Sequence, residues 1–163
     1  MSIKSRDLRT GDSCETQCID SFRLLTGSDL AHTTPGHRFD YISEENKVLV
    51  EIKGRHCRHD RYPTTMVGMS KINAFQQMDG EWKLWLGVCF SDGLWAAQIT
   101  PEVIGRSCES RGGRCDRGRP EYRQYLYIPM SEFTKVEGSH SSLQPHQPTP
   151  QQWRRSPPSQ RRT

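Results

Sequence analysis

Two acids and a lysine lie close together in the first third of this 163-residue chain, at Asp40, Glu51 and Lys53. Carboxylate oxygens are hard ligands that suit Mg²⁺, and a lysine ammonium is a compact charge that can contact a phosphate or help to activate water. Hydrolysis of a phosphodiester bond needs an activated water and compensation of phosphate charge, and a bound divalent ion helps to supply both. We therefore interpret the three residues as a candidate site for this chemistry, in which the main-chain carbonyl of Ile52 could add a third oxygen ligand.

Two β-strands are predicted to position these side chains, at residues 38–43 and 48–53, joined by the polar loop 44–47. Side chains alternate along a strand, so Glu51 and Lys53 share a face whatever the partner strand is. Asp40 joins them only if the numbers of paired residues sum to an odd value such as 91, which sets Asp40 opposite Glu51. A slip of one position would turn Asp40 to the other face.

The remaining elements follow from periodicity and turn residues. A one-sided amphipathic helix is predicted for residues 12–26, with Asp12 or Ser13 as N-cap and Gly27 as its stop. A second helix is predicted for about residues 65–78, where methionines and other apolar residues recur at helical spacing. The other predicted elements are a polar, basic loop over 54–65, two strands at 82–90 and 94–99 joined by a turn, a short helix at 100–105, an exposed loop over 106–123, a strand at 122–128 and a helical turn at 129–133.

This order of elements predicts a mixed α/β (α+β) fold in which helices flank a mixed central β-sheet. We expect one folded domain over residues 1–137. Residues 138–163 are rich in Pro, Ser, Gln and Arg and contain almost no aliphatic side chains. Such a segment cannot bury enough apolar surface to offset its chain entropy, so we predict a disordered tail there.

The formal net charge of +4 comes from the tail, which carries four arginines and no acid, and this leaves residues 1–137 with no net charge. Local clusters therefore matter more than the total. Arg55, Arg58, Arg61 and Lys71 are candidate phosphate contacts, and the alternative is an ordinary solvated charged loop. Binding through such residues would be sensitive to salt and would carry little sequence information.

The six cysteines form neither a dense disulfide framework nor paired zinc knuckles, and they indicate reduced thiols inside a cell. A structural zinc held by Cys57, His59, Cys108 and Cys115 is an alternative, although no pair has the short spacing usual for zinc ligands. The N-terminus does not read as a secretory signal, and no apolar run approaches the roughly 20 residues that a bilayer requires. We expect a soluble, intracellular protein without a membrane partner.

An aspartate followed eleven positions later by Glu-x-Lys resembles the motif of the PD-(D/E)XK nuclease superfamily, carried here by Asp40, Glu51 and Lys53. Phe39 occupies the position where relatives often have proline, which is not a ligand. The order of elements is most similar to that of the compact Holliday-junction resolvases. The resemblance implies a restriction-endonuclease-like core, a metal-dependent nuclease activity, and Glu15 of the first helix as a further metal or water ligand.

Our hypothesis is a Mg²⁺- or Mn²⁺-dependent endonuclease that cleaves DNA, including branched DNA. An RNA endonuclease of the cap-snatching type is an alternative, with His32 or His37 as its histidine. A binding module that keeps the fold is another, although two acids would repel the phosphates it binds. Resolvases and many restriction enzymes act as dimers, so a homodimer is a further alternative. The plainest alternative is that the acids and Lys53 are ordinary polar residues on the solvent-facing side of a two-stranded ribbon.

Overall fold

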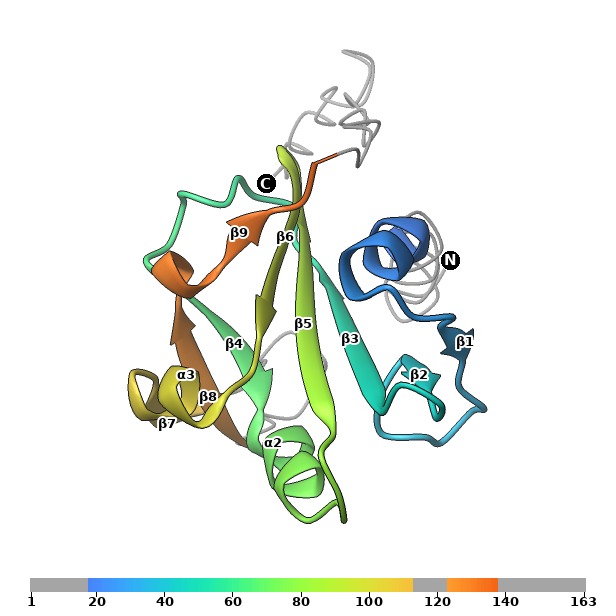
Figure 1. The fold of residues 1–163 in the computed structure, drawn as a ribbon. Coiled ribbons are helices and arrows are strands. Elements are labelled where there is room, and N and C mark those ends of the chain that lie inside the picture. Colours follow the sequence, from blue (N-terminus) through green and yellow to red (C-terminus); the bar gives the residue numbers. More distant parts are fainter. Residues whose placement is uncertain (1–17, 113–122, 138–163) are drawn as a thin grey trace, which may run out of the picture.

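The computed structural model describes residues 18–112 and 123–137 (Figure 1). Within these residues the helices are residues 18–26, α2 (Met69–Gln76), α3 (Pro101–Gly105) and the 3-10 turn η1 (Met130–Glu132). The strands are β1 (Ala31–His32), β2 (Tyr41–Ser43), β3 (Val48–Gly54), β4 (Thr64–Gly68), β5 (Lys83–Phe90), β6 (Gly93–Gln98), β7 (Cys108–Gly112), β8 (Arg123–Pro129) and β9 (Thr134–Lys135). None of the described helices is long and apolar enough to cross a membrane.

The described strands form two sheets. A six-stranded sheet has the order β1-β2-β3-β5-β6-β9, and a three-stranded sheet has the order β4-β8-β7. The larger sheet is mixed, because β3 pairs parallel with β5 and antiparallel with β2. The prediction of a mixed α/β fold is confirmed, and β3, the strand that carries Glu51 and Lys53, lies inside the larger sheet.

The register between β2 and β3 has the predicted odd sum along the three residues of β2. Tyr41 pairs with Val50, and each further pair of the two strands also sums to 91. β2 begins at Tyr41, so Asp40 directly precedes the strand, and its N–H still donates to the carbonyl oxygen of Val50 at 3.1 Å. The register of 91 ends at Tyr41, because the bond from Asp40 to Val50 joins residues whose numbers sum to 90. The predicted pairing of Asp40 with Glu51 is therefore not among the strand pairs, and Phe39 packs on the face of Leu49.

Both faces of β3 are buried, and this explains its nearly continuous apolar sequence. On one face Val48, Val50 and Ile52 pack with helix 18–26, whose Phe22 is fully buried. On the other face Leu49 packs with α2 and with residues of the smaller sheet. Glu51 shares the face of Leu49, so it points into the layer that α2 covers.

Two predicted boundaries are wrong. The helix predicted from residue 65 begins at Met69, and the residues before it form β4, which pairs with β8. The exposed loop predicted over 106–123 contains β7, an edge strand that also pairs with β8. Both strands depend on a partner distant in the sequence, and β7 is polar and largely exposed, so it has no alternating apolar pattern.

The strand predicted over 38–43 is shortened to β2, and the two-residue strands β1 and β9 were not predicted. The remaining described elements agree with their predictions. β5 and β6 form an antiparallel hairpin around the turn at Asp92. α3 begins after Thr100, whose hydroxyl oxygen accepts the N–H of Val103 at 3.3 Å and caps the helix. β8 and η1 follow as predicted, and Phe133 is buried behind them. The first part of the predicted N-terminal helix and the predicted tail lie outside the described residues.

Candidate active site

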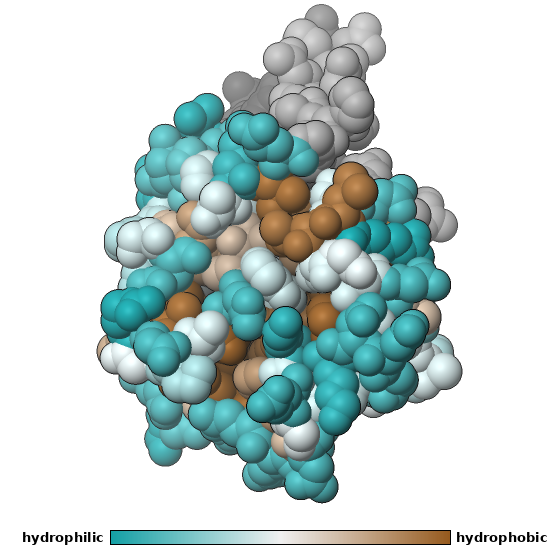
Figure 2. Space-filling view, viewed as in Figure 1, coloured by the Kyte–Doolittle hydropathy of each residue, from teal (hydrophilic) through white to brown (hydrophobic). Residues whose placement is uncertain are grey.

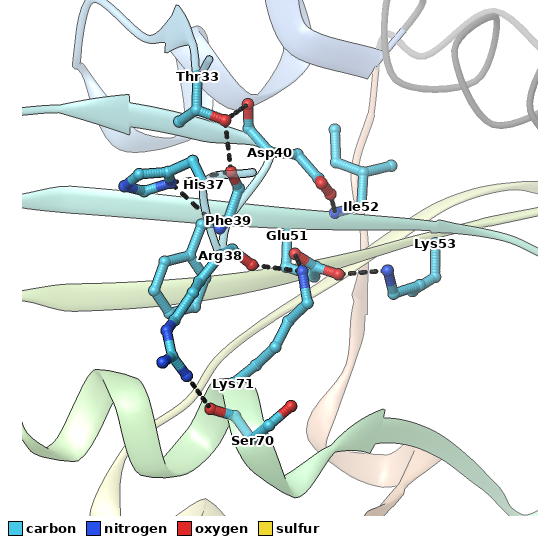
Figure 3. A network of polar contacts seen from close by, with 10 residues as sticks. All are labelled: Thr33, His37, Arg38, Phe39, Asp40, Glu51, Ile52, Lys53, Ser70 and Lys71. Carbon is cyan, nitrogen blue, oxygen red and sulfur yellow. Dashed lines mark hydrogen bonds and ion pairs between the residues drawn. The ribbon is translucent and has the colours of Figure 1, made fainter. Parts of the chain in front are cut away.

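Glu51 is the centre of the site. It is only 1 % exposed, and each of its carboxylate oxygens is paired with a lysine ammonium. Lys53, two residues further along β3, pairs with Oε1, and Lys71, from the first turn of α2, pairs with Oε2 (Figure 3). This burial excludes the alternative in which Glu51 lies on the solvent-facing side of a ribbon.

Asp40 is held against β3 by its own side chain. Its Oδ2 accepts the backbone N–H of Ile52 at 2.7 Å (Figure 3). The N–H and carbonyl of one strand residue point to the same neighbouring strand, so the carbonyl oxygen of Ile52 also leaves β3 on the side of Asp40. The Asp40 carboxylate and this carbonyl oxygen therefore lie on the same side of β3, just before β2 begins, and Asp40 is near enough for its charge to raise the pKa of Glu51.

Thr33 fixes the segment that delivers Asp40, a role that the sequence did not reveal. Its hydroxyl donates to the carbonyl oxygens of Phe39 at 2.5 Å and of Asp40 at 3.1 Å, and its N–H donates to Asp40 at 3.0 Å. These hydrogen bonds hold the chain just before β2, where the strand pairing of β2 with β3 has stopped. A hydroxyl seven residues before an acid, in an irregular segment, gives no sequence signal for such contacts.

Burial raises the pKa of Glu51 above its ordinary value. The positive charge of Lys53 opposes this shift, the negative charge of Asp40 adds to it, and the charge of Lys71 opposes it as well. A carboxylate removed from water needs such cationic partners, because an isolated buried charge would be costly. The site thus pairs two acids with two lysines.

Lys71 was predicted as a phosphate contact on a polar helix face, and the structure places it within the acid site. Its ammonium donates to Oε2 of Glu51 and to the carbonyl oxygen of Arg38. Because α2 begins at Met69, Lys71 lies in the first helical turn, and from there it contacts Glu51. The prediction began this helix four residues earlier, so it did not show that Lys71 would contact Glu51.

The other predicted phosphate contacts lie on the segment after β3. Arg55 is half-buried, whereas Arg58 and Arg61 are exposed. Arg58 already contacts the carboxylates of Asp60 at 3.3 Å and Asp92 at 3.7 Å. Arg61 lies over the ring of Tyr62, 5.6 Å from its centroid. The three arginines thus differ in their contacts with carboxylates of the protein.

A contact between His59 and Asp92, which the sequence did not suggest, fastens this basic segment to the β5–β6 turn. Asp92 accepts the backbone N–H of His59 at 3.0 Å and pairs with its ring nitrogen Nδ1 at 2.6 Å. The ring also stacks on Trp95, with the centroids 3.9 Å apart. The segment that carries the three arginines is therefore attached to the β5–β6 turn at His59.

The two histidines weighed for RNA cleavage are both held by nearby backbone groups. Nδ1 of His32 is 2.7 Å from the carbonyl oxygen of Thr33, and the ring packs edge-on to Tyr41. Nδ1 of His37 lies against the backbone of Phe39 (Figure 3). Glu15 lies outside the described residues.

The donor atoms fit a hard divalent ion. Across residues 18–112 and 123–137, no three His, Cys, Asp or Glu side chains come together as a metal cluster. Of the residues considered for zinc, Cys57, His59 and Cys108 lie in these ranges and Cys115 lies outside them. Mg²⁺, however, is commonly held by one or two carboxylates together with substrate phosphates and water. Asp40, Glu51 and the Ile52 carbonyl oxygen form a set of this kind.

The sequence matches a family described as "Phage putative PDDEXK endonuclease" over residues 11–136. The matched span contains both acids and both lysines of the site. None of the curated proteins matches the chain.

Proposed function

Because this chain belongs to the family of phage PD-(D/E)XK endonucleases, we propose that it is a Mg²⁺- or Mn²⁺-dependent endonuclease that cleaves DNA, with branched DNA among its substrates. The observation that supports this most is the buried Glu51, with Lys53 paired to it on the same face of β3 and the Asp40 carboxylate bonded to the backbone of the next residue, Ile52. An acid pair with an adjacent lysine suits phosphodiester hydrolysis better than simple binding.

Each residue has a distinct proposed role. Asp40 and Glu51 hold the divalent ion together with the carbonyl oxygen of Ile52, and Glu15 is an auxiliary acid. The bound ion would supply an activated water and charge stabilisation at the phosphate. Lys53 contacts the scissile phosphate and orients the attacking water, for which its placement beside Glu51 is suited.

The substrate backbone is proposed to follow the basic residues near the site. Arg55, Arg58 and Arg61 lie on the segment that leaves β3 directly after Lys53, and Lys71 lies on α2. Such contacts position a phosphate backbone without reading its bases. This arrangement favours a substrate recognised by shape and charge rather than by sequence.

The test is cleavage by the purified chain of branched, duplex and single-stranded DNA, and of RNA, with Mg²⁺ or Mn²⁺ and with a chelator. We expect cleavage of DNA that the chelator abolishes. Lys53→Ala and Asp40→Asn should each lower the rate by about 100-fold or more, whereas Lys135→Ala, on the distant strand β9, should not. Full activity of Lys53→Ala, or no cleavage of any substrate, would refute the proposal, and preferential cleavage of RNA would replace DNA as the substrate.

A further inference from the structure

Lys71 reaches the acid site from a different element than the other site residues. Asp40, Glu51 and Lys53 belong to β3 and the segment before β2, but Lys71 comes from α2, which covers this face of the sheet. Its ammonium bridges Oε2 of Glu51 and the carbonyl oxygen of Arg38, two residues before Asp40 (Figure 3). Lys71 therefore joins the strand of one acid to the segment of the other.

The two lysines balance the charge of the two acids. When all four side chains are ionised, Asp40, Glu51, Lys53 and Lys71 have no net charge. A divalent ion added to this set would give the site two excess positive charges beside the buried Glu51, where such an excess is unfavourable. A phosphodiester brings a negative charge, so it compensates part of that excess.

Lys71 is the cation that a metal would compete with first. A metal bound by both acids must lie between Glu51 and the segment of Asp40, and Lys71 bridges these same two parts. Lys53 pairs with the other oxygen of Glu51 and extends further along β3. The ammonium of Lys71 also lies over the Phe39 ring, 5.9 Å from its centroid, which is a cation–π contact.

We propose that Lys71 is a built-in counter-ion of Glu51 that competes with the divalent ion and passes to the scissile phosphodiester when nucleic acid binds, so that metal and nucleic acid bind cooperatively. The inference rests on the proposed endonuclease function. Bound nucleic acid offers Lys71 another anionic partner and so lowers the cost of releasing Glu51. By linkage, the metal must raise the affinity for nucleic acid by the same factor.

The test is calorimetric titration of Mn²⁺ into the full chain, alone and with a phosphorothioate duplex that resists hydrolysis. Lys71→Met removes the charge and keeps a long stem, and Lys71→Gln removes the charge but can still donate to the Arg38 carbonyl. Lys71→Arg keeps the charge. Lys135→Met removes a lysine on β9, away from the site. Circular dichroism identifies the variants that fold.

We expect the duplex to raise the Mn²⁺ affinity of the wild type by about tenfold or more, which is a common size for coupling between sites. Without DNA, Lys71→Met and Lys71→Gln should bind Mn²⁺ about tenfold more tightly than the wild type, and most of the effect of the duplex should disappear. Lys71→Arg and Lys135→Met should keep weak binding without DNA and a strong effect of the duplex.

Equal Mn²⁺ affinity of the wild type and either folded neutral variant in the absence of DNA would overturn the inference. An undiminished effect of the duplex in these variants would do the same. The outcome is separable from that of the proposed function: cleavage without any effect of Lys71 on Mn²⁺ binding would refute only the counter-ion. Lys71-dependent Mn²⁺ binding without cleavage of any nucleic acid would refute only the endonuclease.

Discussion

Two carboxylates, Glu51 and Asp92, each fasten a segment of the chain to the larger sheet. Glu51 pairs with Lys71 and joins β3 to α2. Asp92 pairs with His59 and joins the basic segment after β3 to the β5–β6 turn. Glu51 is buried within the candidate site, whereas Asp92 is near the surface. We therefore expect Glu51 to contribute mainly to function and Asp92 mainly to stability.

Burial acts to raise the pKa of Asp92, but the hydrogen bonds from the ring and the backbone N–H of His59 outweigh it and leave the pKa below its ordinary value of 3.8. A folded-state pKa below the unfolded value means that the ionised form stabilises the fold. This stabilisation is complete above about pH 4 and is lost as the pH falls through the lowered pKa.

Asp92→Asn should therefore lower the free energy of unfolding at pH 7 by about 1–3 kcal/mol, the range for a hydrogen-bonded charged group. Urea denaturation at pH 7 and near pH 2.5 measures the effect, and the difference from the wild type should narrow at the lower pH. Asp60→Asn is the control, since its contact with Arg58 is exposed and worth little. A difference that does not change with pH would contradict the role given to the charge.

At the scale of elements, helix 18–26 packs on β5 through Phe22 and Gly87. A Cβ atom on Gly87 would lie 2.5 Å from the ring of Phe22, which is fully buried. β5 is also the parallel partner of β3, with Gly87 beside Ile52. The absence of a side chain at this position lets the helix approach the sheet directly behind the site.

Gly87→Ala should displace Phe22 and lower the free energy of unfolding by about 1–3 kcal/mol, as overpacking of a core does. Gly105→Ala is the matched control, since its Cβ would meet nothing within 4 Å and lies at the end of α3. We expect that control to be neutral or slightly stabilising. Urea denaturation of both variants measures the contrast, and equal stabilities would show that the helix does not rest on Gly87.

The sequence predicted those parts of the fold that local pattern determines. Alternation along β3 placed Glu51 and Lys53 on one face, and the four-residue loop after β2 fits the register of 91 that β2 and β3 adopt. It missed β4 and β7, because each is stabilised by pairing with β8, distant in the chain. It also missed the contacts of Lys71 with Glu51 and of His59 with Asp92, since both join segments that only the tertiary fold brings together.

At the scale of the molecule, polar residues cover most of one face, and an apolar patch interrupts them near helix 18–26 (Figure 2). Leu24 and Leu25 of this helix are exposed and line a groove of about 550 Å³ together with Trp85 and Val136. The proposed contacts to nucleic acid lie elsewhere, on the segment after β3 and on α2. The apolar groove and the basic residues therefore belong to separate surfaces.

The arginines after β3 should differ in how they affect the salt dependence of DNA binding. Replacing Arg61 with Gln should reduce the slope of log K against log salt by about 1, the value for one phosphate contact. Arg58→Gln should reduce it less, because Asp60 and Asp92 already neutralise this side chain. Fluorescence anisotropy with a labelled duplex between about 50 and 200 mM salt measures both slopes. Equal reductions would show that the internal ion pairs of Arg58 open on binding.

The parallel pairing of β3 with β5 has a consequence for the order in which the chain folds. β2 and β3 are neighbours in the sequence and can pair through a short loop, whereas β3 and β5 are separated by residues 55–82, which contain β4 and α2. Contacts that close long loops form more slowly than local ones. The hairpin thus carries Asp40, Glu51 and Lys53 before β5 joins it, and this part of the site has two acids and one lysine until α2 docks and adds Lys71.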